Sequence, residues 1–237
     1  MRIGGVSKDL PDGITDKIWN FVRAFPDHVK EYETLLTKNV IWLKRTKGIG
    51  IISKEDAINW GMTGPSLRGS GVKYDVRKAF PYSSYDEFDF EIPIGSVGDV
   101  YDRYIVRLRE MEWSNAIVEQ TLERLPKGPI LSDNPWVALP PKDNVLKDID
   151  ALIRQFKIAS EGFQPPKGEV YVSVEASKGE LGYYLVSDGS NRPLRMRIRP
   201  PSFLNLSALP KMIEGSLIAD VISAIGSIDI VLGEIDR

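Results

Sequence analysis

The chain has 237 residues, 42% of them apolar and 27% charged, with a formal net charge of −2. This is the composition of an ordinary soluble globular chain, long enough to bury a core of its own. The lack of cysteine excludes disulfides, thiolate nucleophiles and cysteine-bound metals. The near-neutral charge argues against general nucleic-acid binding. No apolar run approaches the roughly 18 residues of a membrane span, and "MRIGGVSKDLPDG" lacks the apolar core of a secretory signal.

Helical spacing of apolar residues dominates the start of the chain. Thr15 is placed to cap a helix that Pro26 should kink or break, and the pattern continues to about Thr37. The single histidine, His28, lies in its charged part and is expected at the surface, so a Ser-His-Asp triad and a multi-histidine metal site lack the necessary residues. A second, short helix is expected over residues 40–46.

A further helix is indicated by "SKEDAINWG", where Ser53 and Asp56 have capping-box-like spacing and Gly61 stands at the carboxyl end. The longest predicted helix runs from about Gly98 to Leu125. Its charged residues lie largely off the apolar stripe, which favours a solvated face. These charged residues are Arg103, Arg107, Arg109, Glu110 and Glu112.

Between these helices lies the glycine-rich segment "GPSLRGSGVKYDVRK", with no clear apolar period. It resembles a phosphate-binding loop, but Ser70 stands where a P-loop needs lysine. Tyr74 likewise stands where the Rossmann fingerprint needs its third glycine. Nucleotide binding by either motif is therefore not expected. We predict an ordered loop over residues 61–82 in which Gly69 and Gly71 allow unusual backbone conformations and Arg68 contacts neighbouring groups.

The second half of the chain begins with an open, proline-rich stretch over residues 126–142. Asp143 is placed to cap a helix that continues to about Ser160, with an apolar face expected to point inward. That face consists of Leu146, Ile149, Ile153 and Phe156.

The period then changes to two in "EVYVSVEA", "GYYLVS" and "LRMRIR", which predicts a three-stranded antiparallel meander. In the third strand Leu194, Met196 and Ile198 should face the core. Arg195, Arg197 and Arg199 share the other face, either keeping it solvated or binding an anion or RNA.

The fold class is therefore α+β, mostly helical with a small three-stranded antiparallel sheet. We expect one domain with a helical region at residues 1–165, the meander at 166–202 and carboxyl-terminal helices with a tail at 203–237. In the tail, "SIDIVLGEIDR", charges alternate with apolar residues, so we expect it to pack with its charges partnered.

Several long segments together resemble one family, the D subunit of proton-pumping NADH:quinone oxidoreductase (respiratory complex I), which is called the H subunit in plastid and cyanobacterial complexes. They include "RIGGVSKDLPDG", "KEDAINWGMTGPSLRGSGVKYDVRKAFPY", "FDFEIPIGSVGDVYDRYIVRLREM", "YVSVEASKGELGYYLVSDGSNRPLRMRIRPPSFLNL" and "ADVISAIGSIDIVLGEIDR". The resemblance covers nearly the whole chain and is weakest at about residues 126–148. It implies a fold like that of the distantly related large subunit of nickel–iron hydrogenases. The lack of cysteine fits the oxidoreductase and not the hydrogenase.

The resemblance implies that the tail lies against a quinone pocket. The matched residues are Asp229, Val231, Gly233, Glu234, Ile235, Asp236 and Arg237. Val231 and Ile235 would form an apolar wall, and the charged members would tune headgroup binding and proton supply, or else only line the cavity. Family members are longer, and the histidine and tyrosine that contact the quinone belong to an amino-terminal part not found in this sequence.

The chain is expected to bind no cofactor or metal and to have no catalytic residue or activity alone. FMN and iron–sulfur clusters would belong to other subunits. The implied partners are the cluster-bearing subunit, the C subunit, the membrane arm and quinone, and the implied location is peripheral, on the cytoplasmic side of a bacterial inner membrane. The alternative is a scaffold or assembly module derived from the same family, without quinone chemistry.

Overall fold

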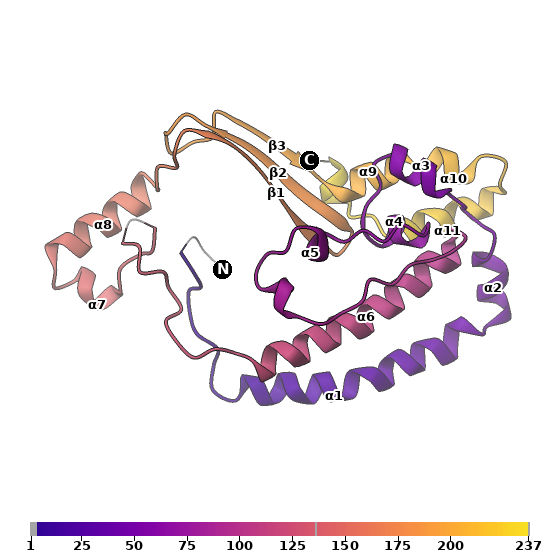
Figure 1. Ribbon diagram of the computed structural model, residues 1–237, viewed down its shortest axis with the longest axis horizontal. Coiled ribbons are helices and arrows are strands. Elements are labelled where there is room, and N and C mark those ends of the chain that lie inside the picture. Colours follow the sequence, from indigo (N-terminus) through magenta and orange to yellow (C-terminus); the bar gives the residue numbers. More distant parts are fainter. Residues whose placement is uncertain (1–3, 136, 237) are drawn as a thin grey trace. The chain divides into compact units, whose positions relative to one another are not determined.

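The computed structural model describes residues 4–135 and 137–236 (Figure 1). It is mostly helical with one small antiparallel sheet of strand order β1-β2-β3, which confirms the predicted fold class. The strands are β1 (Gly168–Ala176), β2 (Gly179–Ser187) and β3 (Arg195–Arg199). The helices before the sheet are α1 (Ile14–Tyr32), η1 (Glu33–Thr37), α2 (Val40–Thr46), α3 (Lys54–Asn59), α4 (Gly64–Gly69), α5 (Val76–Ala79), η2 (Tyr85–Glu87), α6 (Val100–Glu123), α7 (Lys142–Val145) and α8 (Ile149–Ser160). Those after it are α9 (Pro201–Ser207), α10 (Leu209–Ile213), α11 (Ile218–Ile228) and α12 (Leu232–Asp236).

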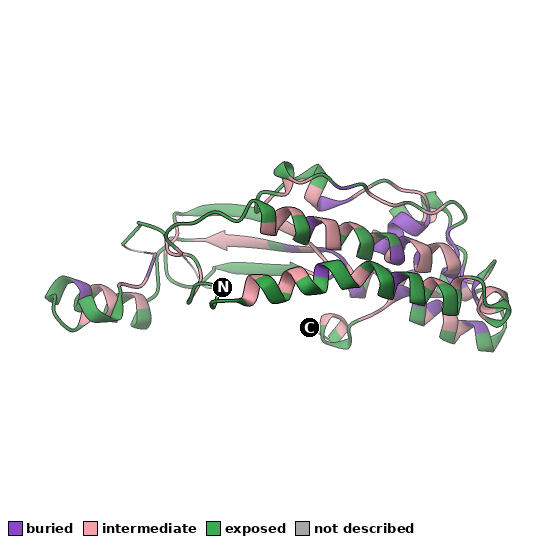
Figure 2. Cartoon of the chain, turned by 90° about the horizontal axis from the view of Figure 1, so that it is seen from below, coloured by how far each residue is buried: buried purple, intermediate pink, exposed green. Residues whose placement is uncertain are grey.

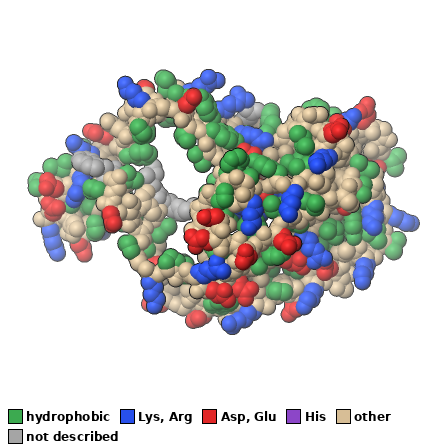
Figure 3. All heavy atoms as spheres, in the orientation of Figure 1, with side chains coloured by type: hydrophobic (Ala, Val, Ile, Leu, Met, Phe, Trp, Pro, Cys, Tyr) green, Lys and Arg blue, Asp and Glu red, His purple; other side chains and the backbone are tan. Residues whose placement is uncertain are grey.

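The chain divides into two compact units. The smaller unit comprises Met1–Lys17, Arg124–Tyr171 and Tyr184–Arg197, and the larger unit comprises Ile18–Glu123, Val172–Tyr183 and Ile198–Arg237. Within the described residues, no helix is both long and apolar enough to cross a membrane. Basic and acidic side chains are interspersed on the face shown in Figure 3, in keeping with the near-neutral net charge.

The core of the larger unit is formed where helices from both halves of the chain pack together. It consists of Ile52, Ala57, Met62, Leu67, Ala208, Met212 and Ile228, each less than a tenth exposed. These residues come from α3, α4, α10, α11 and the segments between them, so the first and last thirds of the chain share one core (Figure 1). Burial of such side chains is the main stabilising contribution to a domain of this kind.

Two of the predicted helices are confirmed, and both are capped by side chains. Helix α2 covers Val40–Thr46, and the Asn39 side chain accepts hydrogen bonds from the amides of Ile41 and Trp42. Helix α3 begins after Ser53, whose Oγ accepts from the Asp56 amide at 3.0 Å and donates to the Asp56 carboxylate at 2.9 Å. Side-chain capping of free backbone amides explains why these two helix starts are visible in the sequence.

Of the two outcomes expected at Pro26, a kink or a break, the break does not occur: helix α1 continues to Tyr32. Proline lacks the amide that would bond the carbonyl four residues earlier, which is that of Val22. In the structure the Asn115 side-chain amide of α6 donates to the Val22 carbonyl at 3.1 Å instead. A tertiary hydrogen bond thus replaces the one that Pro26 removes, and α1 stays regular alongside α6 (Figure 1).

The glycine-rich segment contains two short helices, α4 and α5, where only an ordered loop was expected. Gly64 has φ +69°, and a Cβ there would lie 2.4 Å from Gly179 Cα. Gly71 has φ +81°, but Gly69 does not need the left-handed region: it lets Arg103 approach, since a Cβ would lie 2.7 Å from its Cγ. Close packing, as well as backbone conformation, therefore requires these glycines.

The meander forms as predicted, but its side chains are less buried than expected. The strands are drawn mostly in the exposed and intermediate colours of Figure 2. Leu194, Met196 and Ile198 are 69%, 54% and 38% exposed, so the expectation that they face a core is wrong for this chain. The strand period fixes which side chains share a face but not what covers that face.

The segment after the proline-rich stretch forms α7 and α8, with Asp148 as the cap of α8, in place of one helix capped by Asp143. The four apolar residues expected to point inward are instead exposed: Leu146 by 78%, Ile149 by 71%, Ile153 by 48% and Phe156 by 67%. The amphipathic pattern was recognised correctly, but within the described residues little covers its apolar side.

Candidate functional site

The candidate site lies in the larger unit and is built on α6. The loop before α6 is held by Asp102, whose carboxylate accepts from the amides of Ser96 at 2.7 Å, Val97 at 2.5 Å and Gly98 at 3.2 Å. Burial alone would raise the pKa of Asp102, but these backbone hydrogen bonds outweigh it and lower the pKa. The start of α6 is thus fixed by a charged cap, which orients the helix residues that follow.

Arg103, the next residue, is fully buried, so the prediction of a solvated face is wrong here. Its guanidinium donates to the Gly98 carbonyl and the Gly50 carbonyl, both at 2.8 Å, and to Ser227 Oγ at 2.9 Å. Burial, together with the nearby charge of Arg107, lowers the pKa of Arg103 to about 10. It therefore remains charged at neutral pH and ties α6 to α11.

One turn further along, Arg107 forms the centre of the site together with Asp229 and Lys178. The Arg107 Nε lies 3.9 Å from Asp229 Oδ2, and Lys178 Nζ contacts the same oxygen. The Arg107 Nε is inaccessible to solvent yet has no hydrogen-bond partner among the described residues. Burial lowers the pKa of Arg107, partly offset by the charges of Asp229 and Glu110. Two cations thus share one carboxylate, leaving a local excess of positive charge.

Asp229 occupies this position because α11 ends there. It is the residue that closes the helix, with φ +58° in the left-handed region. Aspartate tolerates this conformation better than most residues. The side chain is 45% exposed, in contrast to the nearly closed environment of Arg103.

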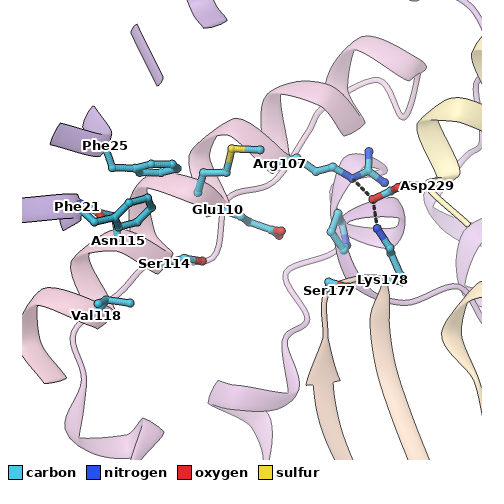
Figure 4. A pocket seen from close by; sticks show the side chains of 12 residues that line it. Phe21, Phe25, Arg107, Glu110, Ser114, Asn115, Val118, Ser177, Lys178 and Asp229 are labelled. Atoms are coloured by element: carbon cyan, nitrogen blue, oxygen red, sulfur yellow. Dashed lines mark hydrogen bonds and ion pairs between the residues drawn. The ribbon is translucent and has the colours of Figure 1, made fainter. Parts of the chain in front are cut away.

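Two cavities, each of about 390 Å³, meet at Arg107 and Asp229. The first is shown in Figure 4, where Phe21 and Phe25 stand at one end and Arg107, Lys178 and Asp229 at the other. It is lined by Phe21, Phe25, Pro65, Arg107, Glu110, Met111, Ser114, Asn115, Val118, Ser177, Lys178 and Asp229. The second is lined by Trp42, Arg45, Thr46, Val100, Tyr104, Arg107, Ile222, Ser223, Gly226, Ser227 and Asp229.

The arrangement is suited to a flat, largely apolar ligand with a polar edge. Apolar and aromatic walls with a few convergent polar groups are typical of small-molecule sites. Here Arg107 and Lys178 are hydrogen-bond donors, whereas Asp229 and Glu110 are acceptors able to bind protons. A ligand group that carries or gains negative charge would be stabilised by the two cations.

Of the predicted tail residues that the structure describes, only Asp229 lines these cavities. The tail packs as α12: Glu234 accepts from the Ser202 amide at 3.1 Å and from its hydroxyl at 2.5 Å, and the Val231 amide donates to Ser202 Oγ at 3.2 Å. Gly233 and Asp236 are exposed, Ile235 is half-buried, and Arg237 lies outside the described residues.

Arg68 is one of the most buried residues of the chain and lines neither cavity. It reaches the site indirectly, because its Nε donates to Glu110 at 2.6 Å and Glu110 lines the first cavity. Arg199, one of the three strand arginines, donates to the carbonyls of Glu180 and Gly61 at 3.1 and 3.0 Å. Arg195 and Arg197 are exposed.

The sequence reasoning missed Arg107 and Lys178. The nearest indication was the pair Arg103 and Arg107, four residues apart and therefore on one side of a helix. Nothing in the sequence showed that this side would be buried against α11. Lys178 lies in the turn between β1 and β2, where a lysine gives no indication of a site.

With the geometry established, the comparisons give the family. The model of the family described as "Respiratory-chain NADH dehydrogenase, 49 Kd subunit" matches residues 1–237. The chain therefore belongs to this family, as the resemblance implied. Its similar proteins include the NADH-quinone oxidoreductase D subunits of Geotalea uraniireducens, 59% identical over 236 residues, and of Magnetococcus marinus, 52% identical over 236 residues.

Both alignments cover all of this chain but only 60% and 59% of the relatives. The protein named as the second NADH-quinone oxidoreductase D subunit of Thermodesulfovibrio yellowstonii is 53% identical over 240 residues, 60% of its length. The chain thus spans about 60% of the length of these relatives.

Proposed function

We propose that the chain is part of the quinone-reducing module of an NADH:quinone oxidoreductase and forms one wall of its quinone site. The observation that carries the proposal is the meeting of two mostly apolar cavities at Arg107 and Asp229, with Lys178 of the first cavity contacting the Asp229 carboxylate. Asp229 belongs both to this junction and to the tail that the family resemblance assigned to the quinone pocket. The names of the relatives support the same reaction.

In this proposal the aromatic and aliphatic walls bind the quinone ring, and the Arg107 and Lys178 side chains donate toward a carbonyl oxygen. Reduction adds two electrons and two protons to the quinone. The electrons come from iron–sulfur clusters of partner subunits, which receive them from NADH through FMN. This chain contributes positive charge where the oxygen becomes negative, and carboxylates through which protons can pass.

The proposed partners are the cluster-bearing subunit, the C subunit and the membrane arm of such a complex, on the cytoplasmic side of a bacterial inner membrane. Exposed apolar residues of the chain support docking: Ile218 is 91% and Ile222 78% exposed on α11, and Ile41 is 75% exposed on α2. Apolar surface of this extent is typical of proteins that work within assemblies. A scaffold without quinone chemistry would use the same surfaces, and the following experiment separates the two.

The experiment uses complexes assembled with this chain carrying Asp229→Asn. Lys178 then loses its anionic partner, and we expect the KM for quinone and the sensitivity to quinone-site inhibitors to change by about tenfold, as for loss of one charged hydrogen bond. Glu112→Gln, an exposed change on α6, is the control. Unchanged KM and inhibitor sensitivity in fully assembled Asp229→Asn complexes would support the scaffold instead.

A further inference from the structure

A second group of charges lies beside the first cavity and shares only Glu110 with its lining. Its centre is Arg68, whose side chain is 2% exposed. The guanidinium donates to Glu110 at 2.6 Å, to Glu175 at 2.8 Å and to the Tyr74 carbonyl at 3.0 Å, and lies 3.5 Å from Asp75. Three carboxylates from α6, β1 and the start of α5 thus surround one arginine.

The charges of this group do not balance. Arg77 adds a second cation, with its Nη2 2.6 Å from Asp75 Oδ2. Two arginines facing three carboxylates leave one excess negative charge when every carboxyl is ionised. Glu110 is 18% exposed and is the only one of the three that also interacts with Arg107. The Asp75 and Glu175 side chains are only 1% and 5% exposed, so solvent hardly compensates the negative charge at these two. An unpaired buried charge is costly, and binding one proton removes it.

The surroundings indicate which carboxyl holds that proton. Burial raises the pKa of Asp75, but the hydrogen bonds of Arg77 and the charges of both arginines outweigh it, so this group stays ionised. Burial and then the negative charge of Asp75 raise the pKa of Glu175, despite the opposing effect of Arg68. Protonation of Glu175 at Oε2 disrupts only the 3.2 Å hydrogen bond that this oxygen accepts from the Val76 amide.

Glu110 connects this group of charges to the first cavity, because it belongs to both. This carboxylate lines the first cavity (Figure 4). It also shares Arg68 with Glu175. Its side chain is 18% exposed, against 5% for Glu175. The other charged or titratable groups around Glu175 are Arg68 of α4, Asp75 and Arg77 at α5, and Tyr74 and Tyr82 of the adjoining loops.

We propose that the Arg68 cluster, formed by Arg68, Asp75, Arg77, Glu110 and Glu175, stores one exchangeable proton and supplies it to the first cavity through Glu110. When the proton leaves, the net charge of the cluster goes from zero to −1, and the ligand gains one proton. Uptake of one proton from the bulk solvent then returns the cluster to zero net charge. The delivery to quinone rests on the proposed function, whereas the stored proton does not.

The stored proton is tested on the whole chain by infrared spectroscopy during a pH titration. We expect a protonated-carboxyl band that disappears with rising pH, at a midpoint above that of an ordinary glutamate, and that is missing in Glu175→Gln. Glu110→Gln removes a neighbouring negative charge and should lower the midpoint by about one pH unit. Glu112→Gln, exposed on the same helix, is the control and should leave it unchanged.

Delivery is tested in assembled complexes with decylubiquinone. Glu110→Gln should slow turnover by about a hundredfold, the lower range for general acid catalysis, with a changed pH profile, and Glu110→Asp should restore part of it. A titration without a Glu175 band, or a midpoint insensitive to Glu110, would overturn the stored proton whatever the reaction. Normal turnover and pH profile of Glu110→Gln complexes in which Asp229→Asn does act would overturn delivery alone, leaving the quinone wall in place.

Discussion

Replacing Arg103 tests whether α6 and α11 are joined as the structure shows. In Arg103→Met the carbonyls of Gly50 and Gly98 and the hydroxyl of Ser227 lose the guanidinium as a donor, although Gly98 still accepts from the Ile52 amide and Ser227 still donates to the Ala224 carbonyl. Each hydrogen bond from a charged donor contributes about 2 kcal/mol, so the loss of the three costs about 6 kcal/mol. Against this, methionine avoids burying a charge. That penalty is roughly 3 kcal/mol, in keeping with the lowering of the pKa of Arg103 to about 10. The net loss of unfolding free energy should be about 3 kcal/mol.

Urea unfolding of the larger unit measures this loss through tryptophan fluorescence. Trp42 is a suitable reporter because its ring lies 5.2 Å from that of Tyr104, beside the second cavity. Arg109→Met is the matched control: its side chain is 49% exposed and pairs with Glu112, so its loss should cost no more than about 0.5 kcal/mol. Equal effects of the two substitutions would refute a fully hydrogen-bonded, buried Arg103.

Three further predictions concern the same unit. Gly64→Ala should lower the free energy of unfolding in urea by about 3 kcal/mol, because the φ of Gly64 is +69° and an added Cβ would meet Gly179. The control Gly61→Ala, with φ +68° and open space around it, should cost about 1 kcal/mol. Equal costs would contradict the close approach of Gly64 to Gly179. Ser202→Ala should speed hydrogen exchange in α12, because Glu234 loses its hydroxyl donor; unchanged protection would show that other contacts hold the tail. The raised pKa of Glu175 stabilises the fold below pH about 4.5, and this contribution is lost as the pH rises through the folded-state pKa. The wild type should therefore lose stability relative to Glu175→Gln over that pH range. A constant difference in unfolding free energy between the two proteins would contradict the raised pKa.

The elements that could be predicted from the sequence are those whose cause is local. Asn39 and Ser53 cap their helices with their own side chains, and the period of two alone defines the meander. The sequence left open whether Pro26 would kink or break α1, since the continuity of the helix depends on a hydrogen bond from Asn115, far along the chain. The short helix at Gly64–Gly69 was missed because glycine and proline normally interrupt helices, although proline is favoured in a first turn.

The residues of the candidate site also divide into those that the sequence identified and those whose environment depends on tertiary packing. Asp229 was identified through the family resemblance of the tail and lies at the junction of both cavities. Arg103 and Arg107 were assigned to a solvated face because charges off an apolar stripe usually face water. Their burial is decided by α11, which packs on α6 from more than a hundred residues later. Glu175 likewise could not be identified from the sequence, because its charged environment is created by Arg68.

The central claim is that quinone binds where the two cavities meet. A photoreactive quinone analogue, applied to complexes assembled with this chain and followed by peptide mapping, tests it most directly. The account predicts labelling of the α6 segment at Arg107–Met111 and of the segment at Asp229, competed away by excess decylubiquinone. Competable labelling of the assembled complex that leaves both segments of this chain unmodified would contradict it.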